Sequence, residues 1–203
     1  MRTLAIETAT EACSIALFEG KKLIANRNEV FGRGHAEKLI PMIGELPGRG
    51  KAARVLVSLG PGSFIGVRIG IAAARALGLA WGAEVQGYPT LGLVAAMARQ
   101  KNETVLACMN GGHGEWFVQQ FDVEGLPEKP ASSFPPAEVA FSGNVVAGNR
   151  AAEFSAMHGF AGRVVDILPD ASRAPDLPEE LITRRLSPIY GRAPDAKPKS
   201  LPG

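Results

Sequence analysis

A glycine-rich loop is the first place in the sequence where chemistry is expected. Residues 60–66 read Gly-Pro-Gly-Ser-Phe-Ile-Gly and join an apolar run to a long apolar stretch. Free backbone amides and a partial positive charge at such a helix start stabilise a phosphate or a carboxylate. Gly60, Gly62 and Ser63 are therefore candidate anion contacts, and the Ser63 hydroxyl is also suited to cap the helix.

The loop differs from a Walker A phosphate loop. That motif needs a lysine followed by serine or threonine, whereas the first cation here is Arg68, beyond the loop. A tight strand-to-helix turn is the simpler explanation of the glycines. Anion binding at this loop is therefore one of two open interpretations.

Glu7 and Thr8 follow the first apolar run and are expected at the end of a strand. A carboxylate in the turn after such a strand can organise a metal ion and water near a phosphate, so both residues are candidate nucleotide contacts. A solvated turn carboxylate is the alternative for Glu7, and no second Asp-Gly phosphate turn supports the nucleotide interpretation.

Other residue types that often carry chemistry lack partners at useful spacing. The histidines, His35, His113 and His158, include no pair three or four residues apart, so we expect no metal site. Ser63 has no evident histidine and acid partners for nucleophilic catalysis. A hydrolase is therefore poorly supported by the residues themselves.

The elements that must position these residues alternate in a regular order. The first half predicts strands at 3–6, 14–18 and 23–25, a helix at 39–46, a strand at 55–58, a helix at 67–81, a strand near 85 and a helix at 90–99. Three strands followed by alternating helices and strands are typical of a mixed sheet with helices on its faces. We expect an α/β fold similar to the ribonuclease H-like half of actin-like proteins.

A second lobe is predicted to begin after the polar break at 100–103. Its predicted elements are hairpin strands at 105–109 and 116–122, an irregular connection at 123–141, a strand at 145–147, a helix at 151–157 and a strand at 164–167. The predicted organisation is a first lobe at 1–101, a smaller second lobe at 102–193 and a mobile tail at 194–203.

Small residues recur at every fourth position of the long helix. They are Gly66, Gly70, Ala74 and Gly78, and each interior glycine costs about 1 kcal/mol relative to alanine. Such a row needs a packing reason, and close approach of another element is the natural one. That element could belong to this chain or to a partner, and the sequence leaves both open.

Composition is that of an ordinary folded protein. Hydrophobic residues form 46% of the 203 residues and charged residues 21%. The formal net charge of +2 is too balanced for a protein that coats nucleic acid by charge alone, so contact with RNA is expected through a partner.

Cys13 and Cys108 lie far apart in apolar surroundings and are expected in the core. No signal peptide or run of 18 apolar residues is evident, which predicts a cytoplasmic protein without membrane contact.

Three motifs in this order carry a family resemblance: IETATEACSIAL, HAEKLIPMI and GPGSFIGVRIGIAAARALGLA. They resemble the TsaB (YeaZ-like) family, accessory subunits of bacterial tRNA threonylcarbamoyladenosine synthesis. The match covers about the first 100 residues, and Pro188, Tyr190 and Arg192 resemble the family's closing pattern. The resemblance implies two ribonuclease H-like lobes of the actin-like ATPase fold, the second small and reduced.

Several positions depart from the family pattern. Glu7 replaces an aspartate, Ile65 replaces a threonine of the loop, and 110–112 replaces an Asp-Ala-Arg-like segment. The region 173–186 looks shortened. These departures weaken the expectation of direct ligand contact at the loop and leave the second lobe less securely placed.

The resemblance implies a subunit without catalytic or metal site and without intrinsic cofactor, which heterodimerises with the catalytic subunit TsaD. ATP or ADP at the partner interface, a TsaE-like ATPase, indirect contact with tRNA and a homodimer of the free chain are implied as well. The implied interface residues, on the two helices of the first lobe, are His35, Leu39, Met42, Ile43, Leu46, Gly70, Ala73, Ala74, Leu77 and Gly78. A nucleotide-binding enzyme of the actin-like superfamily and a glycoprotease-like hydrolase are the alternatives.

Overall fold

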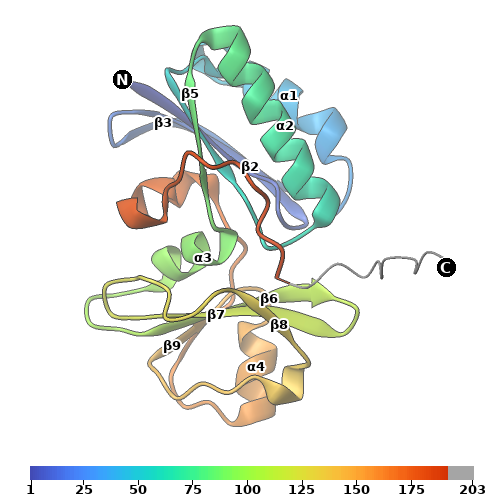
Figure 1. The fold of residues 1–203 in the computed structure, drawn as a ribbon, viewed down its shortest axis with the longest axis vertical. Helices are drawn as coiled ribbons and strands as arrows, with labels where there is room; N and C mark the ends of the chain where they lie inside the picture. Colours follow the sequence, from blue (N-terminus) through green and yellow to red (C-terminus); the bar gives the residue numbers. More distant parts are fainter. Residues whose placement is uncertain (192–203) are drawn as a thin grey trace, which may run out of the picture.

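Residues 1–191 are described by a computed structural model and form two lobes, one above the other (Figure 1). Each lobe is built on a five-stranded sheet. The α/β fold class predicted from the sequence is confirmed, whereas the predicted reduction of the second lobe stays a prediction. The predicted tail, 194–203, lies outside the described residues.

The first sheet has the strand order β3-β2-β1-β4-β5. Its strands are β1 (Arg2–Glu7), β2 (Ala12–Glu19), β3 (Lys22–Val30), β4 (Arg54–Ser58) and β5 (Glu84–Tyr88). β1, β2 and β3 are antiparallel neighbours, as the predicted meander requires, and β4 and β5 run parallel to β1. β1 and β2 are buried on both faces because helices pack on both sides of the sheet, whereas β3 forms an exposed edge.

Helices cover both faces of the first sheet. The four α-helices are α1 (His35–Glu45), α2 (Phe64–Trp81), α3 (Thr90–Ala98) and α4 (Ala151–His158), and the short 3-10 helices are η1 (Pro47–Gly50), η2 (Pro136–Glu138), η3 (Ala171–Asp176) and η4 (Glu179–Leu181). Leu4 and Ile6 of β1 pack under α1 and α2. Ala5 points the opposite way, toward α3 and η3, because side chains alternate along a strand.

The small-residue row of α2 packs against this chain's own sheet. A Cβ atom at Gly70 would overlap the Thr8 side chain, and one at Gly78 would overlap Val85 of β5. At Gly66 it would overlap the Thr8 carbonyl oxygen. The internal alternative for the row is therefore the one that the structure supports.

This packing predicts a large difference between two glycine-to-alanine substitutions. Gly70→Ala should lower the free energy of unfolding by about 1–3 kcal/mol, because the added methyl group must displace Thr8. Gly44→Ala in α1 is the matched control: no atom lies within 4 Å of its new methyl group. The control should be neutral or stabilise by about 0.5–1 kcal/mol. Urea unfolding measures both, and equal effects of the two would contradict the assigned packing.

The second sheet has the strand order β10-β9-β6-β7-β8. Its strands are β6 (Val105–Gly112), β7 (Glu115–Phe121), β8 (Ser132–Phe134), β9 (Val145–Ala147) and β10 (Arg163–Val165). α4 packs on one face, with Phe154 against Leu106 and Val146. α3 packs on the other face and so lies between the two sheets (Figure 1).

The last part of the described chain returns to the first lobe. η3 contacts β1, β2 and α3. Thr183 forms a bridge with Gly87 at the end of β5, and the Ile189 amide donates to the Leu59 carbonyl over 2.7 Å. The predicted second lobe, 102–193, is corrected accordingly: its part from about residue 170 belongs with the first sheet.

Most predicted elements are present at the predicted places. The connection at 123–141, predicted to be irregular, also holds β8 and η2. Cys13 and Cys108 are buried and unpaired, as predicted for core residues, and burial raises the pKa of each thiol to about 12.

α2 has enough length and apolar character to cross a membrane by those two criteria alone. A single helix of this kind is weak evidence, because the core helix of a soluble protein passes the same test. Here the buried face of α2 packs on β4 and β1.

Candidate functional site

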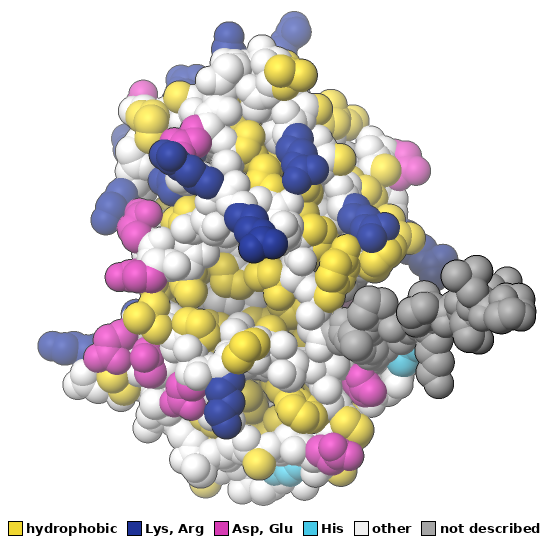
Figure 2. All heavy atoms as spheres, in the orientation of Figure 1, with side chains coloured by type: hydrophobic (Ala, Val, Ile, Leu, Met, Phe, Trp, Pro, Cys, Tyr) yellow, Lys and Arg dark blue, Asp and Glu magenta, His cyan; other side chains and the backbone are white. Residues whose placement is uncertain are grey.

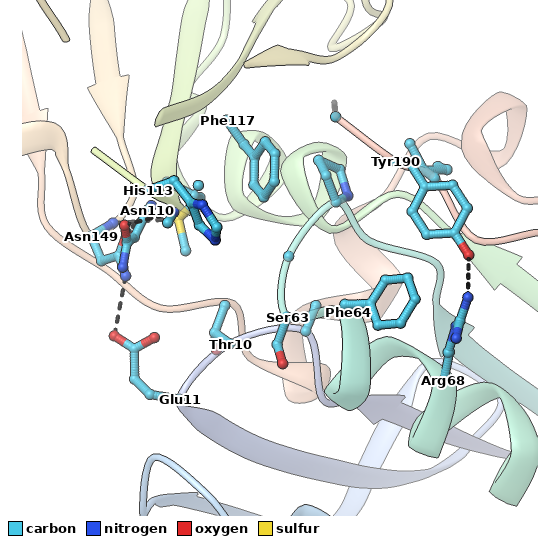
Figure 3. Close-up of a pocket in the computed structure, with 18 of the residues that line it drawn as sticks. Thr10, Glu11, Ser63, Phe64, Arg68, Asn110, His113, Phe117, Asn149 and Tyr190 are labelled. Atoms are coloured by element: carbon cyan, nitrogen blue, oxygen red, sulfur yellow. Dashed lines mark hydrogen bonds between the residues drawn. The ribbon is translucent and has the colours of Figure 1, made fainter. Parts of the chain in front are cut away.

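A cleft of about 920 Å³ lies between the two lobes (Figure 3). The first lobe contributes the turn after β1, the glycine loop and the first turn of α2. The second lobe contributes the hairpin between β6 and β7, and the end of the described chain closes one side. The polar and aromatic residues that line the cleft are Thr10, Glu11, Ser63, Phe64, Arg68, Asn110, His113, Phe117, Asn149 and Tyr190.

Only two of the five predicted ligand contacts line this cleft. Gly62 and Ser63 do, and the Ser63 hydroxyl accepts a hydrogen bond from the Gly66 amide over 3.2 Å, which confirms the predicted helix cap. Glu7, Thr8 and Gly60 are buried and do not line the cleft. Thr8 donates its hydroxyl to the Gly66 carbonyl over 2.8 Å, and Gly60 accepts from the Thr90 amide. The anion site stays a prediction for Gly62 and Ser63 alone.

Glu7 is fully buried, so the alternative of a solvated turn carboxylate is wrong. Its Oε1 accepts from the Ala9 amide over 2.8 Å, while Oε2 makes no hydrogen bond of normal geometry to the described part of the chain. Burial raises the pKa of Glu7 to about 7, against the smaller opposite effects of the Ala9 amide and the Ser58 and Tyr88 hydroxyls. The protonated and charged forms of Glu7 therefore coexist near neutral pH.

The raised pKa of Glu7 predicts a pH-dependent stability. The folded protein holds the proton up to about pH 7, whereas the unfolded chain releases it near pH 4.5, so this stabilisation is complete below pH 4.5 and is lost as the pH rises through 7. Relative to Glu7→Gln, wild-type protein should lose about 3 kcal/mol of unfolding free energy over that range. Urea unfolding of both proteins from pH 4.5 to 8 measures the difference. A difference that does not change with pH would contradict the raised pKa.

Charge is divided between the two ends of the cleft. At one end, Glu11 accepts from the Asn149 amide group over 3.1 Å, and Asn149 accepts from the Asn110 amide over 2.9 Å, so a carboxylate links the two lobes. At the other end, the Arg68 guanidinium stacks 3.6 Å from the Phe64 ring centroid and donates to the Tyr190 hydroxyl over 3.2 Å (Figure 3). The carboxylate of Glu11 disfavours a phosphate at its end of the cleft.

Nucleophilic chemistry has little support among the lining residues. The Ser63 hydroxyl is occupied as a helix cap, and no histidine hydrogen bonds to it within residues 1–191. In the same part of the chain, no three His, Cys, Asp or Glu side chains are grouped to hold a metal ion.

The predicted partner-interface residues are mostly buried inside this chain. His35, Leu39, Met42, Ile43, Leu46, Gly70, Ala74 and Gly78 are buried, and Ala73 and Leu77 are partly buried. His35 contacts the Ala12 carbonyl over 3.2 Å. These side chains therefore pack within this chain, and their assignment to a partner interface stays a prediction.

Exposed apolar residues on α2 were missed by sequence reasoning. Leu79 is 89% exposed and Ile65 is 69% exposed, and together with the exposed Ala72 and Ala76 they follow helical spacing. We call these four residues the α2 ridge. Ile40 of the neighbouring helix α1 is also exposed. The ridge could have been predicted from the sequence, because α2 still has apolar residues on its other faces once the small-residue face is assigned to the sheet.

Comparison with known proteins places the chain in a family of this fold class. Residues 24–156 match the family TsaD, tRNA N6-adenosine threonylcarbamoyltransferase, and the chain belongs to that family. Within it, the chain is of the TsaB/YeaZ type. It is 42% identical over 137 residues to the tRNA threonylcarbamoyladenosine biosynthesis protein TsaB of Escherichia coli, covering 62% of this chain and 58% of that protein.

Solved structures agree with this placement. YeaZ from Pseudomonas aeruginosa superimposes with a TM-score of 0.76 at 26% identity, covering 93% of this chain and 99% of that one. A second structure from the same organism, described as an uncharacterized protein with similarity to peptidase YEAZ, also has a TM-score of 0.76. The predicted family resemblance is thus confirmed. The chain spans 58% of the length of Escherichia coli TsaB and 56% of that of the TsaB of Haemophilus influenzae.

Proposed function

We propose that this chain is a non-catalytic partner subunit in the threonylcarbamoylation of adenosine next to the tRNA anticodon. It acts by forming a heterodimer with a TsaD-like catalytic subunit. The names of its TsaB relatives support the pathway, and the exposed α2 ridge is the observation that supports a docking role. The location is cytoplasmic, where tRNA is modified.

The α2 ridge has the chemistry of a protein interface. Ile65, Ala72, Ala76 and Leu79 present apolar atoms to water, and Ile40 of α1 adds to them. α1 and α2 pack against each other, so their exposed residues form one surface of the first lobe. Burying such a surface against a partner is favourable by about 25 cal/mol per Å² of apolar area.

A subunit of the same family is the occupant that fits this surface. The chain matches the TsaD family from residue 24 to 156, a span that includes both helices. A catalytic subunit with the same fold would carry an equivalent helix pair, and two such pairs can meet around a pseudo-two-fold axis. The same geometry would allow a homodimer when the catalytic subunit is absent.

The residues of the cleft favour a partner role over catalysis. Ser63 caps α2, and Glu7 is sealed in the core. A hydrolase, which the description of one similar structure as peptidase-like would suggest, has no activated nucleophile among these groups. A TsaE-like ATPase and contact with tRNA are further proposed parts of the complex.

Replacing Leu79 with glutamate should break the complex. Burial of a charged carboxylate in an apolar interface costs about 3 kcal/mol, which corresponds to a roughly 100-fold higher dissociation constant. Met157→Glu on α4 is the matched control, because Met157 is also an exposed apolar residue but lies on the second lobe. Calorimetric titration with the catalytic subunit of the same organism measures both. Wild-type affinity of Leu79→Glu would show that the ridge is not the interface.

The pathway itself is tested in cells by measuring threonylcarbamoyladenosine in tRNA with mass spectrometry. Depletion of the chain should lower the modification, and re-expression of wild-type protein or Met157→Glu should restore it. Leu79→Glu should restore it poorly because the heterodimer is weakened. An unchanged level after depletion would contradict the proposed function.

Nucleotide binding is the second candidate function. The cleft and the amides at the start of α2 favour it, whereas the Glu11 carboxylate opposes a phosphate nearby. ATP or ADP at the partner interface is the form of this proposal that the family resemblance implies. Calorimetry of the free chain with ATP and magnesium distinguishes the two candidates: binding and turnover by the free chain would favour an enzyme.

A further inference from the structure

The balanced net charge hides a strong separation of charge between the lobes. The first lobe, residues 1–101 and 170–191, contains 16 lysines and arginines against 11 acidic residues, whereas residues 102–169 contain 3 against 8. Figure 2 shows the cationic side chains mainly over the first lobe on the face that it presents. An anionic partner would therefore be drawn to the first lobe and repelled by the second.

Two arginines of α2 contact the returning chain, residues 184–191, which we call the strap, and the strap itself adds a third arginine. Arg68 donates to the Tyr190 hydroxyl over 3.2 Å, and Arg75 donates to the Leu186 carbonyl over 3.0 Å. Arg185, within the strap, donates to the Ser187 hydroxyl over 3.3 Å. All three side chains belong to exposed residues, and we call them the arginine band.

The charges of the arginine band are not neutralised within residues 1–191. Neighbouring Arg184 forms an ion pair with Glu84 over 2.8 Å, whereas Arg68, Arg75 and Arg185 form none in the described chain. A guanidinium has five N–H donors, and the contacts above use only a few of them. The remaining donors are available to an anion.

The band lies beside the α2 ridge without overlapping it. Arg68 and Arg75 are seven residues apart, which is two turns and about 10.5 Å along one edge of the helix. On the ridge, Ala72 lies one turn after Arg68 and Leu79 one turn after Arg75, so the band directly borders the ridge. A protein bound to the ridge would therefore have the arginines at its rim.

Two exposed aromatic rings accompany the band. Phe64 is 56% exposed and Tyr190 is 52% exposed, and their ring centroids lie 6.0 Å apart beside Arg68 (Figure 3). Guanidinium groups bind phosphates in a bidentate manner, and exposed aromatic faces stack on unpaired bases. Aromatic rings and arginines also occur in protein interfaces, so the test below separates RNA from a protein partner.

From this combination we infer that the arginine band, with Phe64 and Tyr190, binds the phosphate backbone and unpaired bases of RNA. The inference rests on the proposed function in one respect: the RNA is then the tRNA that the complex modifies. It replaces the expectation that contact with RNA runs only through a partner. The contact is made by the edge of α2 and by the strap.

The test is fluorescence anisotropy of a labelled, unmodified tRNA transcript with the full-length chain alone, from low salt upward. Arg75→Gln/Arg185→Gln should weaken binding about tenfold and reduce the slope of log affinity against log salt by about 0.7–0.9 per lost phosphate contact. Lys21→Gln/Lys51→Gln is the matched control, because it removes the same charge from the first lobe away from the strap. The control should change affinity less than twofold.

Three results would overturn the inference: equal losses in both double variants, no loss in either, or no binding of the transcript at low salt. Arg185→Gln alone repeats the test if loss of the Arg75 contact lowers the unfolding midpoint. A band variant that keeps wild-type RNA affinity but loses the catalytic subunit would make the band a protein interface. Because the assay needs no partner, and because the neutral variant Leu79→Ser adds no charge one turn from Arg75, Leu79→Ser should bind RNA normally, so failure of the proposed heterodimer is distinguishable from failure of this inference.

Discussion

The close approach of α2 to its own sheet is the constraint on which the other features depend. Gly66 and Gly70 bring the helix backbone against Thr8, whose hydroxyl donates to the Gly66 carbonyl. This contact fixes the first turn of α2 at the mouth of the cleft. With Val67 and Ile71, the small residues form the buried face of the helix, and the apolar side chains of Ile65 and Leu79 lie on the outside.

The same contact of α2 with Thr8 separates the buried carboxylate of Glu7 from the cleft. Glu7 ends β1 directly before Thr8 and is enclosed when α2 closes over the strand ends. Burial raises the pKa of this carboxylate and the hydrogen bond from the Ala9 amide lowers it, so that the pKa lies at about 7. The group at which superfamily chemistry would be sought is therefore a core residue in this chain, and its titration acts on stability instead of on a ligand.

Sequence periodicity was sufficient for the elements but not for their exposed surfaces. The strands and helices of the first lobe can be predicted from the local pattern of apolar and polar residues. The return of the strap cannot, because it depends on contacts such as that of Thr183 with Gly87, about 100 residues apart, in a segment of short 3-10 helices without periodicity. Of the candidate site, the cap at Ser63 was predictable from local chemistry. The burial of Glu7 and the exposure of Leu79 were not, because α2 is apolar around most of its circumference and only the sheet decides which side faces inward.

The circumference of α2 is consequently divided among three environments. Its small residues meet β1, β4 and β5, its ridge is apolar and exposed, and the edge with Arg68 and Arg75 meets the strap. A docking protein needs an apolar surface, whereas an anionic polymer needs a cationic one. One helix can present both surfaces only if its third face holds it against the rest of the chain. The small-residue row provides that internal face, so the proposed partner surface and the proposed RNA surface have the same structural origin.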